Sequence, residues 1–375
     1  MSKVIPSYVN QQEKSLKLLG TVVSKQANFC QVKLDINECE LPLSAAKSPA
    51  NLLLCTCKAR LKKMGQEVMV GDRVEIEEPD YVDGSGVVAY ILPRQTQLSR
   101  PAMANAGQIM LLFALAEPLL DACQLSRFLV KAESTQLAVG LCLNKTDLIN
   151  SEEQEIWRSR LVSWGYDPLF ISVAHCQGIE KLTTYLQDKI TILAGPSGVG
   201  KSSLVNHLIP EVDLRVAKVS GKLSRGRHTT RHVELFNLPM GGFLADSPGF
   251  NQPDLDCAPT ELASYFPEAR ARLANGNCQF SNCLHRDEPN CLVRGDWERY
   301  EYYLKFLSEA IAYHRTKQQK PDTESNWKLK VGESGEKYYE PKLESKKYRR
   351  RSRRFRKQTV QDFVDEYDEF AEDFE

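Results

Sequence analysis

The stretch Gly195-Pro-Ser-Gly-Val-Gly-Lys-Ser202 decides the fold, because it matches the phosphate-binding pattern G-x-x-x-x-G-K-[ST]. It follows the apolar run Ile190–Ala194, which is typical of a buried strand, and it precedes a helical stretch over Ser203–Leu208. Glycines let the backbone wrap closely around a phosphate, so that successive N–H groups point inward at the beginning of a helix. The stretch therefore predicts a nucleotide site in an α/β domain, with Lys201 on the β- and γ-phosphates and Ser202 on Mg²⁺.

A second motif, Asn144-Lys-Thr-Asp147, follows the apolar run Leu137–Leu143, at the carboxyl end of a predicted strand, where open α/β sheets bind ligands. The carboxylate of Asp147 can accept hydrogen bonds from N1–H and the exocyclic amine of guanine, whereas adenine has no matching pair of donors. Asn144 can bond to N7 of the base, and the stem of Lys145 can cover the ring. Beside a phosphate loop, this motif indicates guanine and argues against a kinase or an ATPase.

A weaker contact to the base is predicted for Ser172-Val-Ala174, which would supply a backbone N–H to the guanine oxygen. An ordinary strand end is an equally good interpretation of these three residues. The predicted contacts to the nucleotide are Asn144, Lys145, Thr146, Asp147, Ser172, Val173, Ala174, Gly195, Pro196, Ser197, Gly198, Val199, Gly200, Lys201, Ser202, Ser203, Asp246 and Gly249.

The two last contacts belong to Asp246-Ser-Pro-Gly249, which matches the D-x-x-G element of GTPases. The aspartate would hold Mg²⁺ through water, and the glycine N–H would sense the γ-phosphate. Between this element and the phosphate loop lies the basic segment Arg225-Gly-Arg-His-Thr-Thr-Arg231. Either Thr229 or Thr230 is the candidate for the switch threonine that closes over Mg²⁺, and the sequence does not choose between them.

The predicted catalytic set is His228, Lys201, Thr229 and Thr230. In Ras-like enzymes a glutamine after D-x-x-G orients the attacking water, but Phe250 occupies that position here and can neither donate nor accept a hydrogen bond. His228 is the nearest group in these motifs that can order a water at neutral pH. A contact between His228 and RNA is an equally weighted alternative.

The order of the motifs is unusual, since Asn144–Asp147 precedes Gly195–Ser202. In ordinary small GTPases the phosphate loop comes first. Moving residues 109–175 to the end restores the usual order of strands and loops, so the same sheet can form with new termini. The sequence therefore predicts a circularly permuted P-loop GTPase domain.

A cluster of thiols and one imidazole follows the GTPase motifs, in the pattern Cys278-x₄-Cys283-x-His285-x₅-Cys291. Three sulfurs and one nitrogen suit tetrahedral Zn²⁺ at a structural site with no open position for water. We therefore expect one structural zinc ion per chain. Cys55 and Cys57 have no neighbouring ligand in the sequence and alternate as strand residues do, so we interpret them as structural.

Four regions are expected along the 375 residues, which makes the fold class multidomain α/β. Short apolar bursts separated by turns predict an N-terminal OB-type β-barrel, and alternating strands and helices predict the GTPase domain. A helical zinc-binding domain and a charged, disordered tail follow. The predicted boundaries are 1–94 for the barrel, 95–252 for the GTPase domain, 253–325 for the zinc domain and 326–375 for the tail.

The composition is that of a globular protein outside membranes, because 42% of the residues are hydrophobic and no stretch reaches the ~20 apolar residues of a membrane span. The beginning of the chain lacks the pattern of a signal peptide. Eleven scattered cysteines argue against a disulfide framework and favour a reducing cytoplasm. We expect a cytoplasmic monomer.

The tail has an asymmetric charge, although the chain as a whole has a formal charge of zero. Ten basic residues and one acid lie between Lys342 and Lys357, with Tyr348 and Phe355 among them, and eight acids follow over 362–375. Basic residues with interleaved aromatics suit binding to RNA phosphates and stacking on bases. A solvated appendage with no specific partner is the alternative.

Together these motifs resemble the RsgA (YjeQ) family of circularly permuted GTPases over about residues 15–315. The resemblance lies in N-K-T-D before G-P-S-G-V-G-K-S-S, in R-G-R-H-T-T, in D-S-P-G-F and in the Cys/His cluster. It implies late maturation of the small ribosomal subunit, with binding to the subunit and rRNA, and GTP hydrolysis stimulated by the subunit. A GTP-controlled RNA-binding module that does not need turnover is the rival interpretation.

Overall fold

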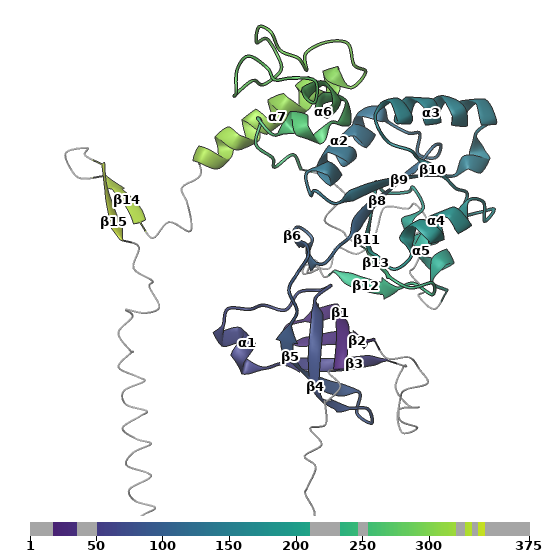
Figure 1. Cartoon of the computed structure of the whole chain (residues 1–375), viewed down its shortest axis with the longest axis vertical. Helices are drawn as coiled ribbons and strands as arrows, with labels where there is room; N and C mark the ends of the chain where they lie inside the picture. Colours follow the sequence, from purple (N-terminus) through teal and green to yellow (C-terminus); the bar gives the residue numbers. More distant parts are fainter. Residues whose placement is uncertain are drawn as a thin grey trace, which may run out of the picture. The chain divides into compact units, whose positions relative to one another are not determined.

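The computed structural model (Figure 1) divides into two compact units, over residues 1–314 and 315–375. None of the helices in the described part of the chain has the length and apolar character that a membrane crossing requires. The residues that the structure describes are 18–35, 51–210, 233–246, 254–319, 327–331 and 337–341.

The N-terminal region is a closed five-stranded barrel, as the short apolar bursts predict. Adjacent strands follow the order β1-β2-β3-β5-β4, and β4 pairs back with β1. Alternate residues point inward, so Val22, Val32 and Val74 are fully buried in its core. A short helix, α1 (Ala59–Lys63), follows the third strand. The barrel strands are β1 (Leu18–Gln26), β2 (Phe29–Leu34), β3 (Leu52–Cys57), β4 (Arg73–Asp80) and β5 (Ser85–Ile91).

The GTPase region is built on a sheet in the order β10-β9-β8-β11-β13-β12, in which only β12 runs antiparallel to its neighbour β13. Its central strand β8 is buried at every position, because helices cover both faces of the sheet. The strands are β8 (Gln108–Ala114), β9 (Ala138–Asn144), β10 (Leu169–Phe170), β11 (Ile190–Ala194), β12 (Glu234–Asn237) and β13 (Phe243–Asp246).

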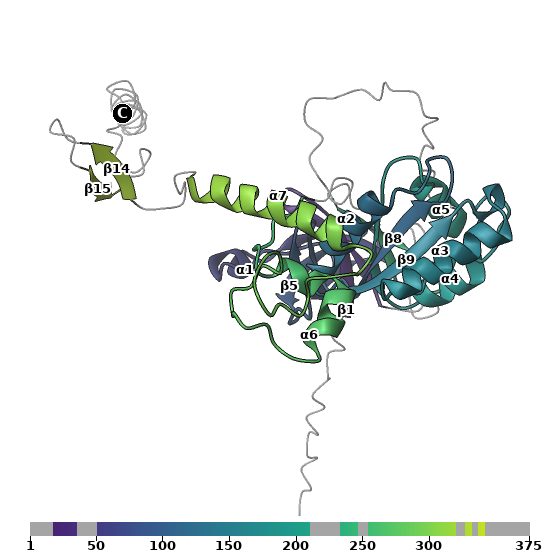
Figure 2. The ribbon, with the colours of Figure 1, turned by 90° about the horizontal axis from the view of Figure 1, so that it is seen from above.

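Helices lie on both faces of this sheet (Figure 1, Figure 2), and a separate apolar core lies on each face. Ile109 and Phe113 of β8 belong to the core under α2 and α3, whereas Met110 and Leu112 belong to the core under α4 and α5. The helices are α2 (Ala122–Glu133), α3 (Ser151–Ser163), α4 (Ile179–Leu186) and α5 (Lys201–Leu208), and the short helix η3 spans Thr146–Leu148.

A small hairpin, β6 (Gln97–Ser99) with β7 (Ala102–Ala104), follows the barrel in the chain. The barrel and the GTPase region are joined through their strands, because β1 of the barrel pairs with β12 of the GTPase region at Ser24 and Glu234. The strands of both regions therefore form one continuous sheet of eleven strands. Strand β12 was not predicted from the sequence, because its four residues carry too little periodicity.

The third region is helical, with η5 (Leu262–Tyr265), α6 (Pro267–Leu273) and the long helix α7 (Tyr300–Gln319). Its core is aromatic: Phe266 makes edge contacts with Trp297 and Tyr303, at centroid distances of 5.3 and 5.6 Å. Such contacts stabilise by about 0.5–1.5 kcal/mol beyond the area that they bury.

The second unit contains an antiparallel hairpin of β14 (Trp327–Val331) and β15 (Lys337–Pro341), with Leu329 opposite Tyr339. These ten residues depart from the disordered tail that the charge pattern predicts. Apolar residues alternate with lysines over Trp327–Val331, and this period of two favours a strand. Residues 342–375, which hold the basic and acidic runs, lie outside the described residues.

Candidate nucleotide site and Cys/His centre

The phosphate loop joins β11 to α5, as predicted. Gly195 and Gly200 have φ values of +152° and +100°, a backbone conformation that side chains disfavour. A Cβ at Gly195 would lie 2.1 Å from the carbonyl oxygen of Leu112, and one at Gly200 would lie 2.5 Å from Nδ2 of Asn144. Both positions therefore require glycine to bring the loop this close to its neighbours.

The ammonium group of Lys201 lies over this loop. Its Nζ donates to the carbonyl oxygens of Gly195 and Pro196, at 2.8 and 2.7 Å. Ser202 and Ser203 follow in the first turn of α5 and are half-buried. A loop of backbone N–H groups with one lysine and a hydroxyl at the beginning of a helix suits a triphosphate with Mg²⁺.

Asn144 ends β9 and is almost fully buried, with 3% of its surface exposed. Its Nδ2 donates to the carbonyl oxygen of Val199 at 2.9 Å, and its Oδ1 accepts from the N–H of Val173 at 3.2 Å. The side chain thus ties the phosphate loop to the loop predicted to meet the base. Sequence reasoning assigned it only a bond to guanine N7.

Asp147 lies beside Ser172, whose hydroxyl donates to its Oδ1 at 2.5 Å. This hydrogen bond is the main reason why the pKa of Asp147 falls below its ordinary value, and a nearby imidazole, His175, adds to it. Ser172 itself is fully buried and accepts the N–H of His175 at 3.2 Å. The carboxylate is thereby held in its charged form, which is the form that can accept two N–H donors.

The two middle residues of the guanine motif have structural partners. Lys145 has a φ of +61°, and its Nζ donates to the carbonyl oxygen of Glu117. Thr146 is buried, and its hydroxyl donates a hydrogen bond of 3.0 Å to the carbonyl oxygen of Ile171. The loop after β8, which contains Glu117, was missed by sequence reasoning. Its position at the carboxyl end of a strand was the available signal.

The predicted switch elements are only partly described. The backbone of Asp246 ends β13 opposite Leu193 of β11, two residues before Gly195, which brings this predicted Mg²⁺ residue to the base of the phosphate loop. His228, Thr229, Thr230 and Gly249 lie outside the described residues, together with the basic segment around them.

The four predicted zinc ligands come together in one cluster. The ligand atoms of Cys278, Cys283, His285 and Cys291 lie within 4.8 Å of one another. Nδ1 of His285 is 3.5 and 3.3 Å from the sulfurs of Cys278 and Cys291, and those two sulfurs are 3.9 Å apart. Zinc–sulfur bonds of ~2.3 Å in a tetrahedron place the sulfurs roughly 3.7 Å apart. The donors therefore fit Zn²⁺ in both kind and spacing.

A carboxylate organises the loop that carries His285. Glu288 accepts hydrogen bonds of 2.8 Å from the N–H groups of Leu284 and Arg286. Burial alone would raise the pKa of Glu288, but these backbone bonds lower it to about 2. The hydroxyls of Tyr300 and Tyr303 on α7 donate to the carbonyl oxygens of His285 and Leu284, at 2.9 and 2.6 Å. The cluster is thus held against α7 by polar contacts that the spacing of the cysteines did not predict.

The fold and the site define a circularly permuted GTPase with two accessory regions. Its mainly parallel sheet carries a guanine motif that precedes the phosphate loop in the sequence, and the barrel and the Cys/His cluster lie before and after this domain.

Comparison with known proteins supports this class. Residues 91–256 match the family model described as RsgA GTPase. The chain has 32% identity to the crystal structure of YjeQ from Thermotoga maritima, with a TM-score of 0.63, covering 79% of this chain and 99% of that one. YloQ, called a circularly permuted GTPase, has 27% identity and a TM-score of 0.62, covering 84% and 100%.

The similarity to curated relatives extends over nearly the whole chain. It is 60% identical over 361 residues to the small ribosomal subunit biogenesis GTPase RsgA of Trichormus variabilis, covering 93% of this chain and 98% of the relative. It is 49% identical to the protein of the same name from Synechocystis, and the match covers 95% of this chain and 98% of the relative. The chain belongs to the RsgA GTPase family, and it is a GTP-hydrolysing enzyme.

Proposed function

We propose that this GTPase binds the small ribosomal subunit, acts late in its maturation and hydrolyses GTP faster when bound to it. One observation carries the proposal: identity of 60% to a small ribosomal subunit biogenesis GTPase spans 93% of the chain, and thus includes the barrel and the Cys/His cluster as well as the nucleotide site. This role places the protein in the cytoplasm, where it would act as a monomer and contact rRNA.

The nucleotide chemistry follows from the arrangement of the site. Asp147 would select guanine, because Ser172 keeps its carboxylate charged and in place. Lys201 would neutralise charge on the β- and γ-phosphates. Ser202 would bind Mg²⁺ directly, and Asp246 through water. His228 would order the attacking water, and Thr229 or Thr230 would close over the γ-phosphate side.

The accessory regions would serve as docking modules. The proposed boundaries are 1–94 for the barrel, 95–252 for the GTPase domain, 253–325 for the zinc domain and 326–375 for the tail. Zn²⁺ at Cys278, Cys283, His285 and Cys291 would stabilise its domain and take no part in hydrolysis. The OB-type barrel and the basic run in the tail are suited to RNA by fold and by charge.

The decisive experiment is steady-state GTP hydrolysis with purified small subunits, large subunits or free RNA. Selective acceleration by small subunits is the expected result. Equal acceleration by free RNA would favour a GTP-controlled RNA-binding module. Binding to small subunits that depends on GTP but leaves turnover unchanged would contradict the proposed hydrolytic cycle.

A further inference from the structure

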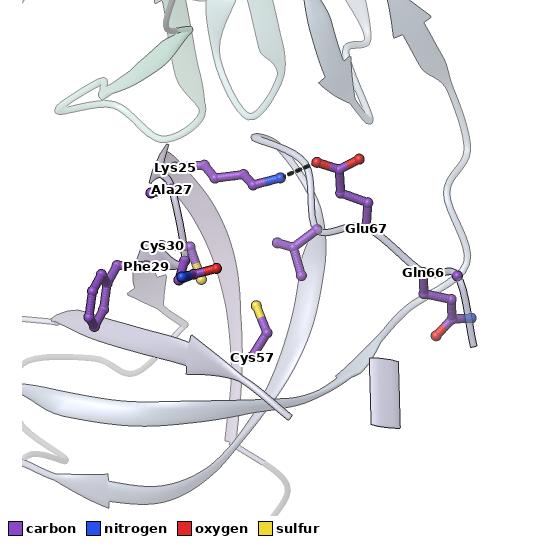
Figure 3. Close-up of a pocket in the computed structure, with 10 residues that line it drawn as sticks. Lys25, Ala27, Phe29, Cys30, Cys57, Gln66 and Glu67 are labelled. Atoms are coloured by element: carbon purple, nitrogen blue, oxygen red, sulfur yellow. Dashed lines mark hydrogen bonds and ion pairs between the residues drawn. The ribbon is translucent and has the colours of Figure 1, made fainter. Parts of the chain in front are cut away.

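The barrel contains a pocket that the nucleotide chemistry does not use. It has a volume of about 350 Å³ and is lined by residues of β1, β2 and β3 and by the segment that leads to β4. Nζ of Lys25 and Oε1 of Glu67 form an ion pair of 2.6 Å across it, and Glu67 is 81% exposed (Figure 3). The size is sufficient for a small molecule, since ligand pockets begin at about 300 Å³.

Two thiols line this pocket, Cys30 from β2 and Cys57 from the end of β3. Cys30 lies opposite Cys55 in the strand register, and Cys57 lies on the same face as Cys55 because side chains alternate along a strand. In Figure 3 the sulfurs of Cys30 and Cys57 are turned toward the same hollow. The thiol of Cys30 donates to the carbonyl oxygen of Cys55 at 3.6 Å, on the strand that also carries Cys57.

The two thiols differ in their exposure. Cys30 is 2% exposed, whereas Cys57 is half-buried and borders the pocket. Cysteines that react are usually partly accessible, and redox-sensing ones often have a second thiol beside them. Cys142, which is fully buried in β9, lacks this accessibility. Cys57 is therefore the thiol that a reagent would meet first, with Cys30 next to it.

We propose that Cys30 and Cys57 are a redox-sensitive dithiol that closes to a disulfide when a small organic disulfide, such as glutathione disulfide, enters the pocket. The thiolate of Cys57 attacks one sulfur of the oxidant, which forms a mixed disulfide and releases one glutathione thiolate. Cys30 then loses its proton and attacks the Cys57 sulfur, which releases the second glutathione. The two cysteines lose two electrons and two protons, and the oxidant becomes two glutathione molecules.

The electrostatics of the pair are consistent with this order of attack. The neighbouring Cys57 side chain, followed by burial, raises the pKa of Cys30 well above its ordinary value. Burial likewise raises the pKa of Cys55 to about 12. Neither thiol is a good first nucleophile, because the thiolate is the reacting form. Cys30 becomes effective only once Cys57 carries the glutathione leaving group beside it.

The test is thiol mapping on the full-length, reduced protein. After treatment with glutathione disulfide, free thiols are alkylated in acid-quenched samples, and the peptides are identified by mass spectrometry. We expect a peptide that links Cys30 to Cys57, with two glutathione molecules released for each link. Cys57→Ala should lose the linked peptide, whereas the matched variant Cys55→Ala should retain it. Cys55 and Cys57 lie in the same tryptic peptide, so the mass of the linked peptide alone does not show which of them is bonded to Cys30. The Cys55→Ala variant removes this ambiguity.

The exposed thiol of Cys176 is an internal reference for the oxidant. If Cys176 becomes glutathionylated while Cys30 and Cys57 both remain alkylated as free thiols, the pair is inert and the proposal is wrong. A mixed disulfide that persists at Cys57 without closure would also overturn it. Both results come from the unmodified protein, so they do not depend on whether a variant folds.

Discussion

The side-chain amide of Asn144 donates a hydrogen bond of 2.9 Å to the carbonyl oxygen of Val199. This bond connects the guanine motif to the phosphate loop across 55 residues of sequence. The same side chain accepts the N–H of Val173, so one buried amide positions three loops of the site. Nucleotide affinity should therefore depend on Asn144 through the shape of the site as well as through a contact with the base.

We predict that Asn144→Ala weakens GTP and GDP binding alike, by about tenfold or more. The substitution leaves the buried carbonyl of Val199 and the partly buried N–H of Val173 without their partner, and the loss at a buried group costs about 1–3 kcal/mol. Fluorescent-nucleotide titration measures the effect. Asn275→Ala, which removes an amide from an exposed position in the helical domain, is the matched control and should leave both affinities unchanged. A loss confined to GTP would show that the amide does not act through the loops.

Asp147→Asn should shift the preference from GTP toward xanthosine triphosphate. In xanthine a carbonyl group replaces the exocyclic amine of guanine, and the side-chain amide of the introduced asparagine can donate a hydrogen bond to it. Competition between the two nucleotides decides the matter, and an unchanged preference for GTP would remove Asp147 from the base site.

The same carboxylate gives a pH prediction. Because its pKa lies below the ordinary value of 3.8, the charged form and any stability it contributes persist as pH falls and are lost only below that value. Ser172→Ala removes the main cause of this shift and should move the loss of GTP affinity to higher pH. Affinity measured from neutral pH downward, for Ser172→Ala and the unmodified protein, provides the comparison. Coinciding pH profiles would exclude Ser172 as the group that holds the carboxylate charged.

Lys201→Ala and Ser202→Ala should each abolish hydrolysis, through loss of charge neutralisation and of the proposed Mg²⁺ ligand. His228→Ala should slow hydrolysis while GTP binding remains. Single-turnover hydrolysis and binding are measured on the same preparations. If His228→Ala instead weakens RNA binding with turnover unchanged, the histidine is an RNA contact.

The sequence predicted those parts of the site in which adjacent residues act together. The phosphate loop and the guanine motif are local patterns, and Cys278–Cys291 gathers its ligands within fourteen residues, so their assembly requires little knowledge of the fold. The apolar burst Leu52–Cys57 likewise indicated a strand, and β3 has these bounds.

Contacts between distant segments could not be predicted in this way. The contacts of Asn144 with Val199, of Lys145 with Glu117 and of Cys30 with Cys55 depend on how strands are ordered and on where loops end. The pairing of Ser24 with Glu234 depends in addition on a four-residue strand that has no distinctive pattern. Strand order in a permuted sheet is a property of the whole chain, which explains why motif spacing does not reveal it.

Zinc removal should destabilise residues of about 255–315 and leave the nucleotide site able to bind GTP, because structural zinc contributes directly to folding. Metal analysis should find one zinc per chain, and Cys283→Ser should lose it. Cys257→Ser, outside the cluster, is the control. Protection from hydrogen exchange, measured with and without a chelator, locates the change. A protein that contains no zinc as purified, or whose exchange is unaffected by its removal, would contradict the structural assignment.

The last prediction concerns Arg299, a fully buried arginine that joins the helical region to the GTPase region. Its Nε donates to Glu268 at 2.7 Å, and its Nη2 donates to the other oxygen of the same carboxylate. Its guanidinium lies 4.8 Å from the ring centroid of Trp164, which follows α3, and 4.9 Å from that of Phe266. Arg299→Met should lower the free energy of unfolding by about 3–5 kcal/mol, because it leaves the largely buried carboxylate of Glu268 without its partner.

The double variant Arg299→Met with Glu268→Gln should recover much of that loss, since both buried charges are then removed. Urea unfolding followed through tryptophan fluorescence, for the two single variants and the double variant, measures the coupling between the charges. Arg270→Met removes a more exposed arginine, paired with Glu133, and should cost about 1 kcal/mol or less. The alternative outcome is that the double variant loses as much free energy of unfolding as the two single variants lose together. In that case the role of Arg299 lies in its stacking on Trp164 and Phe266, and the ion pair contributes little.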